Sequence, residues 1–328
     1  MFASHCTTEM IDAATQKLKE GWLVAFPTET VYGLGADATN PEAVARIYAV
    51  KGRPQDHPLI VHIPDLSLME KWTSEVPEYA IKLARDFWPG PMTLILKRSN
   101  LAGDFITGGQ ETVGLRVPAH PVALGLLSRF AAAGGLGVAA PSANRFGAVS
   151  PTTANAVMDE LIPYLNIDHD RILDGGPSLV GVESTIIDCT QDLPRILRPG
   201  AITAEMIEES TGLRMKPKEE LSIDHVGDEA AEIRVSGSLE SHYSPKAKVV
   251  LDAIPESGEG FIAMSTHATP QGVIRLASPE TVEQYARELY SALRDADARE
   301  LSTVVVIQPS GDGLAEAIRD RLSRSATK

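Results

Sequence analysis

The sequence is poor in cysteine and in long apolar runs. Its two cysteines, Cys6 and Cys189, form no Cys-x-x-Cys pair and have no histidine at metal-ligand spacing. A disulfide framework and a zinc module are thereby excluded. No stretch approaches the roughly 18 to 20 apolar residues of a membrane span, and the first residues lack the basic start and apolar run of a signal peptide. We therefore expect a cytoplasmic protein with no membrane association.

Positive charge is also scarce. The 328 residues carry 30 Lys and Arg against 44 Asp and Glu, a formal net charge of −14, and the deficit holds in both halves of the chain. A protein that binds nucleic acid through a broad basic face shows the opposite balance, because phosphate neutralisation supplies most non-specific affinity. No strong direct binding of nucleic acid is expected.

The familiar nucleotide and hydrolase motifs are missing as well. There is no GxxxxGK[ST] loop, no GxGxxG after a strand, no HExxH and no GxSxG elbow. The short glycine clusters Gly33-Leu34-Gly35 and Gly134–Gly137 are interpreted as turns at strand ends. A nucleotide, if bound, must be held by an unfamiliar arrangement of residues.

What is present is a globular composition, 43% hydrophobic and 23% charged, with apolar strand-like runs alternating with amphipathic helical segments. This alternation predicts an α/β sheet covered on both faces, and the closely spaced short strands near its end predict a mixed sheet. Strands are expected over 22–26, 58–63, 92–97, 113–117, 137–140, 171–175, 184–189 and 194–198. Helices are expected over 8–20, 41–52, 77–87, 121–131, 152–161 and 203–210.

The composition changes after about residue 212. The segment from Glu219 to Glu240 is rich in Asp and Glu, contains one base, Arg234, and shows no sustained periodicity, which is typical of a solvated linker. Beyond Pro245 a fresh pattern predicts four strands within 248–251, 260–264, 273–276 and 302–307, and helices over 279–298 and 312–325. The predicted organisation is a catalytic domain over 1–212, a linker or lid over 213–245 and a smaller Rossmann-like α/β domain over 246–328.

Basic residues stand at unusual positions in this pattern. Arg116 lies inside the apolar run VGLRVP and Arg198 closes RILRP, while Lys51 and Arg53 end a helix. A buried charge without a partner is very costly. Four such residues together favour a shared anionic ligand, although each one alone is compatible with a structural ion pair. Arginine suits a carboxylate or phosphate, and lysine suits phosphate.

At these residues the sequence resembles a known family. Eight motifs occur in order: FPTETVYGLG (26–35), KGRPxxxPL (51–59), FWPGPMTLIL (87–96), VGLRVP (113–118), APSAN (140–144), AVSPT (148–152), GVESTIID (181–188) and ILRPG (196–200). Together they resemble the YrdC-like domain of L-threonylcarbamoyladenylate synthases. The later SHYSPKA (241–247) and the terminal α/β unit resemble the long, two-domain form of that family.

The resemblance implies a twisted, open, mixed α/β sheet with a concave ligand cavity. It also implies a nucleotidyltransferase that makes threonylcarbamoyl-AMP and pyrophosphate from L-threonine, bicarbonate or CO2, and ATP. Mg2+ is expected to arrive with ATP, without a metal site on the protein. The product is expected to feed a downstream threonylcarbamoyl-transferase machinery that modifies tRNA.

The resemblance also implies roles for individual residues. Lys51 and Arg53 are expected to grip the polyphosphate as the catalytic pair. Nucleotide contacts are further expected from His57, Thr112, Ser142, Asn144, Ser150, Arg198 and Tyr243. L-Threonine is expected to contact Thr30, His62, Arg116 and Ser184, with Arg116 pairing with its carboxylate. From the residues alone, His62 is equally compatible with a core histidine, and Tyr243 with packing against the second domain.

Two other functions compete with this one. One is an RNA-binding module of the YrdC-like type without adenylation activity, against which the acidic charge balance argues. The other is carbamoyl transfer in hydrogenase maturation. Proteins of that kind carry zinc-finger modules, which two cysteines cannot supply.

Overall fold

The computed structural model of the chain describes residues 6–215, 233–235, 237 and 243–327. Most of the predicted linker, 213–245, therefore lies outside the described residues, as does nearly all of its acidic run. The domain boundaries at 212 and 245 stay predictions.

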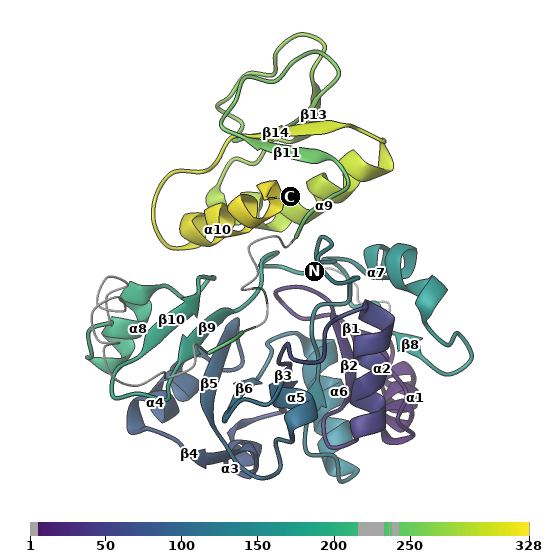
Figure 1. The fold of residues 1–328 in the computed structure, drawn as a ribbon, viewed down its shortest axis with the longest axis vertical. Coiled ribbons are helices and arrows are strands. Elements are labelled where there is room, and N and C mark those ends of the chain that lie inside the picture. The colour runs from purple at the N-terminus through teal and green to yellow at the C-terminus, as the bar shows by residue number, and fades with distance from the viewer. Residues whose placement is uncertain (1–5, 216–232, 236, 238–242, 328) are drawn as a thin grey trace.

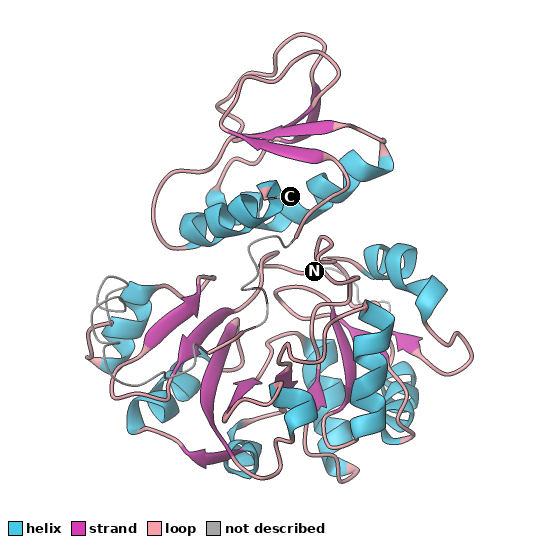
Figure 2. Ribbon diagram, in the orientation of Figure 1, coloured by secondary structure: helices cyan, strands magenta, loops and turns pink. Residues whose placement is uncertain are grey.

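Ten strands form one large mixed sheet (Figures 1 and 2). Its order is β10-β9-β5-β6-β3-β7-β2-β1-β8, with β4 paired to β5. The pairs β5–β9, β3–β6 and β1–β8 are parallel, and the other neighbours along this order are antiparallel. The predicted mixed α/β sheet is confirmed. The strands are β1 (Val24–Phe26), β2 (Gly33–Asp37), β3 (Ile60–His62), β4 (Thr73–Glu75), β5 (Met92–Arg98), β6 (Thr112–Arg116), β7 (Val138–Ala139), β8 (Arg171–Ile172), β9 (Thr185–Asp188) and β10 (Arg195–Arg198).

Helices cover both faces of this sheet along β1. Alternate residues of a strand point to opposite sides of the sheet, so they pack against different helices. Val24 and Phe26 pack with α1 and α6, whereas Leu23 and Ala25 belong to the main core with α2 and α7. No helix among the described residues is both long and apolar enough to cross a membrane. The helices of this part are α1 (Thr8–Lys19), α2 (Pro41–Lys51), α3 (Met69–Trp72), α4 (Glu78–Phe87), α5 (Asp104–Thr107), α6 (Pro121–Ala132), α7 (Ala154–Leu161) and α8 (Ala204–Thr211), with 3-10 turns η1 (Leu66–Leu68) and η2 (Ile162–Tyr164).

The side of β5 and β9 that carries Ile95 and Ile186 is covered differently. Among the described residues, the short segment Ile233–Val235 packs there, and Val235 is buried against both isoleucines. Gln110 fixes this segment by accepting a hydrogen bond from the Arg234 N–H at 2.7 Å and donating one to the Arg234 carbonyl at 3.0 Å. Within the described part of the chain, this short segment packs on that side of the sheet.

Helix α2 shows how local sequence places basic residues at a chosen edge. Asn40 caps its start by accepting hydrogen bonds from two backbone N–H groups, and Pro41 occupies the first turn. Gly52 ends it in the left-handed conformation, with φ of 62°. Lys51 is thus the last helical residue, and Arg53 begins the chain segment that returns toward β3.

One prediction was wrong: Gly33-Leu34-Gly35 is not a turn but the start of β2, which pairs antiparallel with β1 and β7. A β-carbon on Gly35 would lie 2.7 Å from the side chains of both Phe26 and Val138. Gly35, one of the two glycines that suggested a turn, is therefore required for close packing inside the sheet. The short elements α3, β4 and α5 were also not anticipated.

The last quarter of the chain contains a separate four-stranded sheet, entirely parallel, in the order β11-β14-β12-β13. Its strands are β11 (Lys248–Leu251), β12 (Gly260–Ile262), β13 (Ile274–Ala277) and β14 (Thr303–Val306), and its helices are α9 (Val282–Ala298) and α10 (Leu314–Ala326). Each predicted strand and helix of this unit is present. Both helices lie between the small sheet and the large one (Figure 1).

The two units touch closely at Gly181, in the loop before β9. Gly181 has φ of +84°, and a β-carbon there would lie 2.3 Å from the Ala286 carbonyl oxygen and 2.5 Å from the Arg287 Cα of α9. The nearest atoms are backbone atoms of α9, so no side chain could rotate away to accommodate a β-carbon on Gly181. The contact fixes α9 against the loop that precedes Ser184.

We expect Gly181→Ala to destabilise the docking of α9. The loss should exceed the cost of placing an alanine in the left-handed backbone conformation of Gly181. Gly176→Ala is the matched control, because Gly176 has the same φ of +84° and nothing within 4 Å of a β-carbon. A β-carbon in left-handed backbone costs about 1–2 kcal/mol in both variants, and the backbone clash adds a further loss in Gly181→Ala. Thermal unfolding and limited proteolysis measure the difference. Equal losses in the two variants would contradict the tight contact.

Candidate active site

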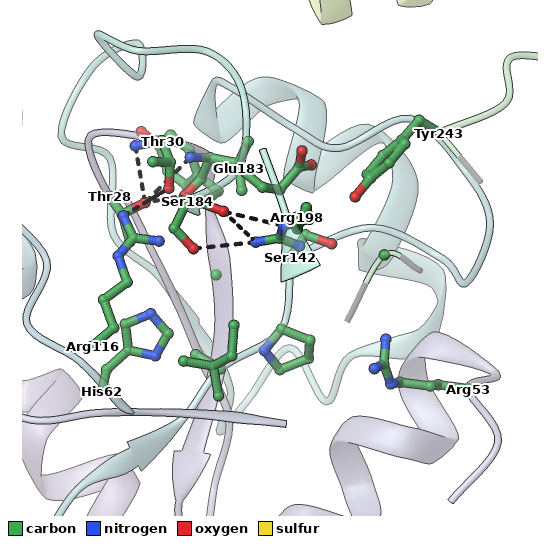
Figure 3. A pocket seen from close by; sticks show the side chains of 17 residues that line it. Thr28, Thr30, Arg53, His62, Arg116, Ser142, Glu183, Ser184, Arg198 and Tyr243 are labelled. Carbon is green, nitrogen blue, oxygen red and sulfur yellow. Dashed lines mark hydrogen bonds between the residues drawn. The ribbon is translucent and has the colours of Figure 1, made fainter. Parts of the chain in front are cut away.

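A cavity lies where several strands of the large sheet end (Figure 3). It encloses about 530 Å3 of space not filled by atoms, part of it open to solvent. Three arginines, one histidine and one carboxylate are among its lining side chains. The lining residues are Thr28, Thr30, Val31, Tyr32, Gly33, Arg53, Ile60, His62, Arg116, Ala140, Pro141, Ser142, Glu183, Ser184, Arg198, Gly237 and Tyr243.

The sheet topology brings His62 and Arg116 together. They are the last residues of the parallel neighbours β3 and β6 and stand opposite each other in the register. Ligand sites of α/β folds form at such carboxyl ends. Thr30 follows β1 and Ser184 precedes β9, so all four predicted threonine contacts line one cavity.

Arg116 is buried and only partly satisfied. Its Nη2 donates to Glu29 Oε1 at 2.5 Å and to Thr30 Oγ1 at 2.8 Å. Glu29 is fixed in turn by the Ala119 N–H, which donates to Oε2 at 2.9 Å. The Nε of Arg116 has no hydrogen-bond partner among the described residues. The guanidinium is held by Glu29 and Thr30 and lines the cavity.

His62 is buried beside Arg116 (Figure 3). Burial first, and the positive charge of Arg116 second, lower the pKa of its imidazole to about 3. The ring is therefore neutral at ordinary pH, and its Nδ1 has no hydrogen-bond partner among the described residues. A neutral imidazole can donate or accept a hydrogen bond without adding charge to the site.

Arg198 and Ser184 form the opposite wall. The Nε and Nη2 of Arg198 donate to the Ser184 carbonyl at 3.1 and 3.0 Å, and Nη2 donates to Ser184 Oγ at 3.1 Å. Ser184 Oγ also shares a hydrogen bond of 2.8 Å with Thr93 Oγ1. Burial lowers the pKa of Arg198, yet arginine keeps its charge.

Arg53 completes the set of three lining arginines. Its Nη2 donates to the Pro58 carbonyl at 2.9 Å, and its guanidinium lies 5.7 Å from the centre of the Phe146 ring. Burial lowers the pKa of Arg53 to about 10. The His57 ring makes an edge contact with Phe146, 5.2 Å between centroids, and His57 does not line the cavity.

Lys51, Asn144 and Ser150 are buried behind the lining. Lys51 Nζ donates to the carbonyls of Ser142 and Asn144 at 2.6 and 2.5 Å, and burial moves the pKa of this lysine well below its ordinary value. Asn144 Nδ2 donates to the carbonyls of Arg145 and Ala148, both at 2.8 Å. In this structure these side chains shape the loop that presents Ser142.

Two further predicted nucleotide residues are placed differently. Thr112 opens β6, at the end remote from Arg116, and lines a small separate pocket beneath Arg234 and Val235. The structure does not bring it to the cavity. Tyr243 does line the cavity, with φ of 59° and its ring stacked on Tyr290 at 5.8 Å between centroids. The adjacent His242 lies outside the described residues.

Two carboxylates were missed as site residues, Glu29 and Glu183. Glu183 accepts hydrogen bonds from Ser150 at 2.7 Å, Tyr290 at 2.8 Å and Arg321 at 2.9 Å. Burial would raise its pKa, but the charge of Arg321, then that of Arg198, and the hydrogen bonds hold the pKa at about 2. A signal for both was available in the sequence. A buried arginine needs an acidic partner, and Glu29 and Glu183 directly precede the predicted site residues Thr30 and Ser184.

The described residues offer no group of three His, Cys, Asp or Glu side chains that would hold a metal ion. Glu183 is the one carboxylate among the lining residues, and three donors already occupy its oxygens. The site is thus built from cations, hydroxyls and a neutral imidazole. Such an arrangement binds anions and stabilises negative charge, and the described lining residues include no nucleophile hydrogen-bonded to a base.

Two family models match the chain. One, described as Telomere recombination, matches residues 16–200, and the other, described as Threonylcarbamoyl-AMP synthase, C-terminal domain, matches residues 202–327.

Similar whole chains are known. A protein of Pyrococcus abyssi (strain GE5 / Orsay) named threonylcarbamoyl-AMP synthase is 38% identical over 325 residues, which is 94% of this chain and 92% of the relative. One of the same name from Bacillus subtilis (strain 168) is 39% identical over 338 residues, 96% and 92% of the two chains. The crystal structure of P. abyssi Sua5 complexed with L-threonine has a TM-score of 0.85 at 36% identity, covering 98% of this chain and 95% of that one.

We expect His62 to make the protein less stable in acid. The unfolded chain protonates this imidazole near pH 6.5 and the folded chain only near pH 3, so between these values the unfolded state binds more protons. The free energy of unfolding should therefore fall as the pH drops from 6.5 toward 3, and His62→Gln should show a shallower fall in urea unfolding. The ring resonance of His62 should stay constant in NMR spectra between about pH 8 and 5. A resonance that titrates near pH 6.5 would refute the burial.

Proposed function

The chain belongs to the threonylcarbamoyl-AMP synthase family, and we propose that it joins L-threonine, CO2 or bicarbonate, and ATP into threonylcarbamoyl-AMP, releasing pyrophosphate. This is a nucleotidyltransferase-type activity. Family models cover both parts of the chain, and the relatives of this name are similar over almost the whole length. The observation that carries the proposal is the cavity, where three arginines and a neutral histidine surround two hydroxyl-bearing loops.

The chemistry suits such a cavity. The α-amine of threonine adds to the carbon of CO2 and loses a proton, which gives an anionic carbamate. A carbamate oxygen then attacks the α-phosphorus of ATP, and the bond to the β-phosphate breaks as pyrophosphate leaves. The nucleophile already carries its charge. The step needs alignment and charge neutralisation more than a protein base.

We place L-threonine at the carboxyl ends of β3 and β6. Arg116 lines the cavity and is available to its carboxylate, and Thr30 and Ser184 offer hydroxyl groups nearby. The neutral ring of His62, which also lines the cavity, supplies a further hydrogen bond without charge. The relative with the TM-score of 0.85 is described as a complex with L-threonine, which supports an amino-acid site in this fold.

We place the nucleotide between Arg53, Ser142, Arg198 and Tyr243, which line the remaining wall. Here the two guanidinium groups face the phosphates, because their forks match phosphate oxygens.

Lys51, Asn144 and Ser150 act in this proposal by holding the loops that bear Ser142 and Ser184. Direct nucleotide contacts from His57 and Thr112 stay predictions, since neither lines the cavity.

Mg2+ enters this proposal as a companion of ATP. Because Glu183 is fully engaged by three donors, the lining residues leave the ion to phosphate and water oxygens, which Mg2+ accepts readily. The product is a mixed anhydride of a carbamate and a phosphate, and such a bond hydrolyses easily. A transferase that passes the threonylcarbamoyl group to tRNA is the class of enzyme that must consume it.

Incubation of the protein with ATP, Mg2+, bicarbonate and L-threonine should release pyrophosphate, and omission of any one substrate should stop the release. The reason is that the carbamate must form before the α-phosphorus can be attacked. A coupled phosphate assay measures the rate, and mass spectrometry identifies threonylcarbamoyl-AMP. Release that does not depend on threonine would contradict the proposal.

Arg116→Ala should raise the KM for threonine by roughly 10- to 150-fold, the equivalent of one charge-assisted hydrogen bond of about 1.5–3 kcal/mol. The KM for ATP should change far less. Since the substitution leaves Glu29 without its ion-pair partner, Arg116→Ala/Glu29→Gln is measured beside it. Arg129→Ala removes an arginine from a more exposed ion pair with Asp12 and serves as the control. An equal loss for both substrates would rule out the assigned role.

A further inference from the structure

The two helices of the small unit reach into the loops that build the cavity. Tyr290 and Arg294 come from α9 and Arg321 from α10. Arg294 donates to the Val149 carbonyl, next to Ser150, and forms an ion pair of 2.6 Å with Glu160. Tyr290 and Arg321 both donate to Glu183, next to Ser184. The small unit thus holds both loops from behind.

Arg321 makes its contacts with this wall from a buried position. Its side chain is 0% exposed. Its Nε donates to Glu183 Oε2 at 2.9 Å, and its Nη2 donates to the Pro199 carbonyl at 2.9 Å, directly after Arg198. Arg321 also pairs with its neighbour Asp320 at 2.5 Å. It touches the strand ends that form the wall of the cavity, but it does not line the cavity itself.

Glu183 stands at a place where a carboxylate is electrostatically unfavourable for the proposed ligand. It lines the cavity together with Arg198 and Tyr243. An uncompensated negative charge there would repel a triphosphate in the same cavity. The repulsion is stronger in the protein interior than in water, because the dielectric constant is lower there. It would also compete with the phosphates for Arg198. A cation behind the wall removes both effects, since it balances the carboxylate and leaves Arg198 to the ligand.

The same cation organises the aromatic side of the cavity. The Arg321 guanidinium lies 5.5 Å from the centre of the Tyr243 ring, and Tyr243 stacks on Tyr290, whose hydroxyl donates to Glu183. Arginine over an aromatic face is favourable. Glu183, Tyr243, Tyr290 and Arg321 therefore form one buried cluster that joins the two parts of the chain.

We propose that Arg321 is a positioning residue for the reaction: it neutralises Glu183 from outside the cavity and thereby sets the affinity for ATP. This inference rests on the proposed function and extends it, because it gives the small unit an electrostatic role at the nucleotide site. The role is specific to charge. It predicts that the loss of Arg321 is corrected by removing the charge of Glu183.

The test uses the full-length protein and calorimetric titration with Mg2+ and a non-hydrolysable ATP analogue. Arg321→Met should weaken binding of the analogue at least tenfold, and Arg321→Met/Glu183→Gln should restore it to within about threefold of wild type. Arg321→Lys keeps the charge and should stay close to wild type. Threonine binding, measured in parallel, should change much less, because threonine carries no net charge.

Arg319→Met is the matched control. Arg319 lies on the same helix, and the contacts of its Nη1 are the carbonyls of Pro309 and Gly311, within the small unit. If wild type and this control bind no ATP analogue, the proposed function fails. If both bind the analogue and Arg321→Met does not, the proposed function stands, and binding by Arg321→Met/Glu183→Gln decides the inference.

A double variant as weak as Arg321→Met, or an Arg321→Met that binds like wild type, would overturn the inference. If thermal denaturation shows Arg321→Met to be unfolded, Glu183→Gln alone decides. The inference then requires Glu183→Gln to bind the analogue more tightly than wild type, because the positive charge of Arg321 remains. Weaker binding by Glu183→Gln would overturn it.

Discussion

The structure depends on the burial of several guanidinium groups at one edge of a sheet. Arg53, Arg116 and Arg198 are each at most 7% exposed, and all three line the same cavity. Stranding such a charge by removing its partner typically costs about 3–5 kcal/mol. Among the described residues, their partners include carbonyl groups, the hydroxyls of Thr30 and Ser184, and one carboxylate, Glu29. The remaining positive potential is what makes the cavity a site for a carboxylate and a triphosphate.

The architecture around the cavity follows from this requirement. Parallel pairing of β3 with β6 sets His62 opposite Arg116, and α2 ends so that Arg53 turns inward. On the side of β5 and β9 that carries Ile95 and Ile186, the described chain contributes the short segment Ile233–Val235. The second carboxylate of the region, Glu183, needs a cation of its own, and Arg321 of the small unit provides it. The small unit therefore contributes a positive charge to the wall of the cavity as well as packing contacts.

Much of this could be predicted from the sequence. Proline and glycine at the ends of α2 and the apolar run of β5 are local signals, and both elements lie near their predicted bounds. Motifs singled out the four residues predicted to bind L-threonine and four of those predicted to bind the nucleotide, and these eight line one cavity; their roles stay predictions. What failed depended on tertiary contacts. Gly33 and Gly35 were interpreted as a turn, because the close packing against Phe26 that requires glycine has no local signature.

Partners distant in sequence were equally hidden. Glu183 and Arg321 are 138 residues apart, and nothing near either one indicates the other. Lys51 was expected on the polyphosphate, yet its ammonium is turned to the carbonyls of Ser142 and Asn144. A sequence shows which residues carry charge, but the topology decides whether that charge faces a ligand or a loop. Thr112 illustrates the same limit, since a motif neighbour of Arg116 lies at the far end of its strand.

The central claim is that one cavity holds threonine and ATP together, with their anionic groups on the buried arginines. A crystal structure of the protein with L-threonine, Mg2+ and a non-hydrolysable ATP analogue tests it most directly. The account predicts the threonine carboxylate on Arg116 and the triphosphate between Arg53 and Arg198, with the threonine amine on the side of the α-phosphate. A nucleotide bound instead in the groove between α7 and α9, which is lined by Arg145, Lys246 and Arg294, would contradict it.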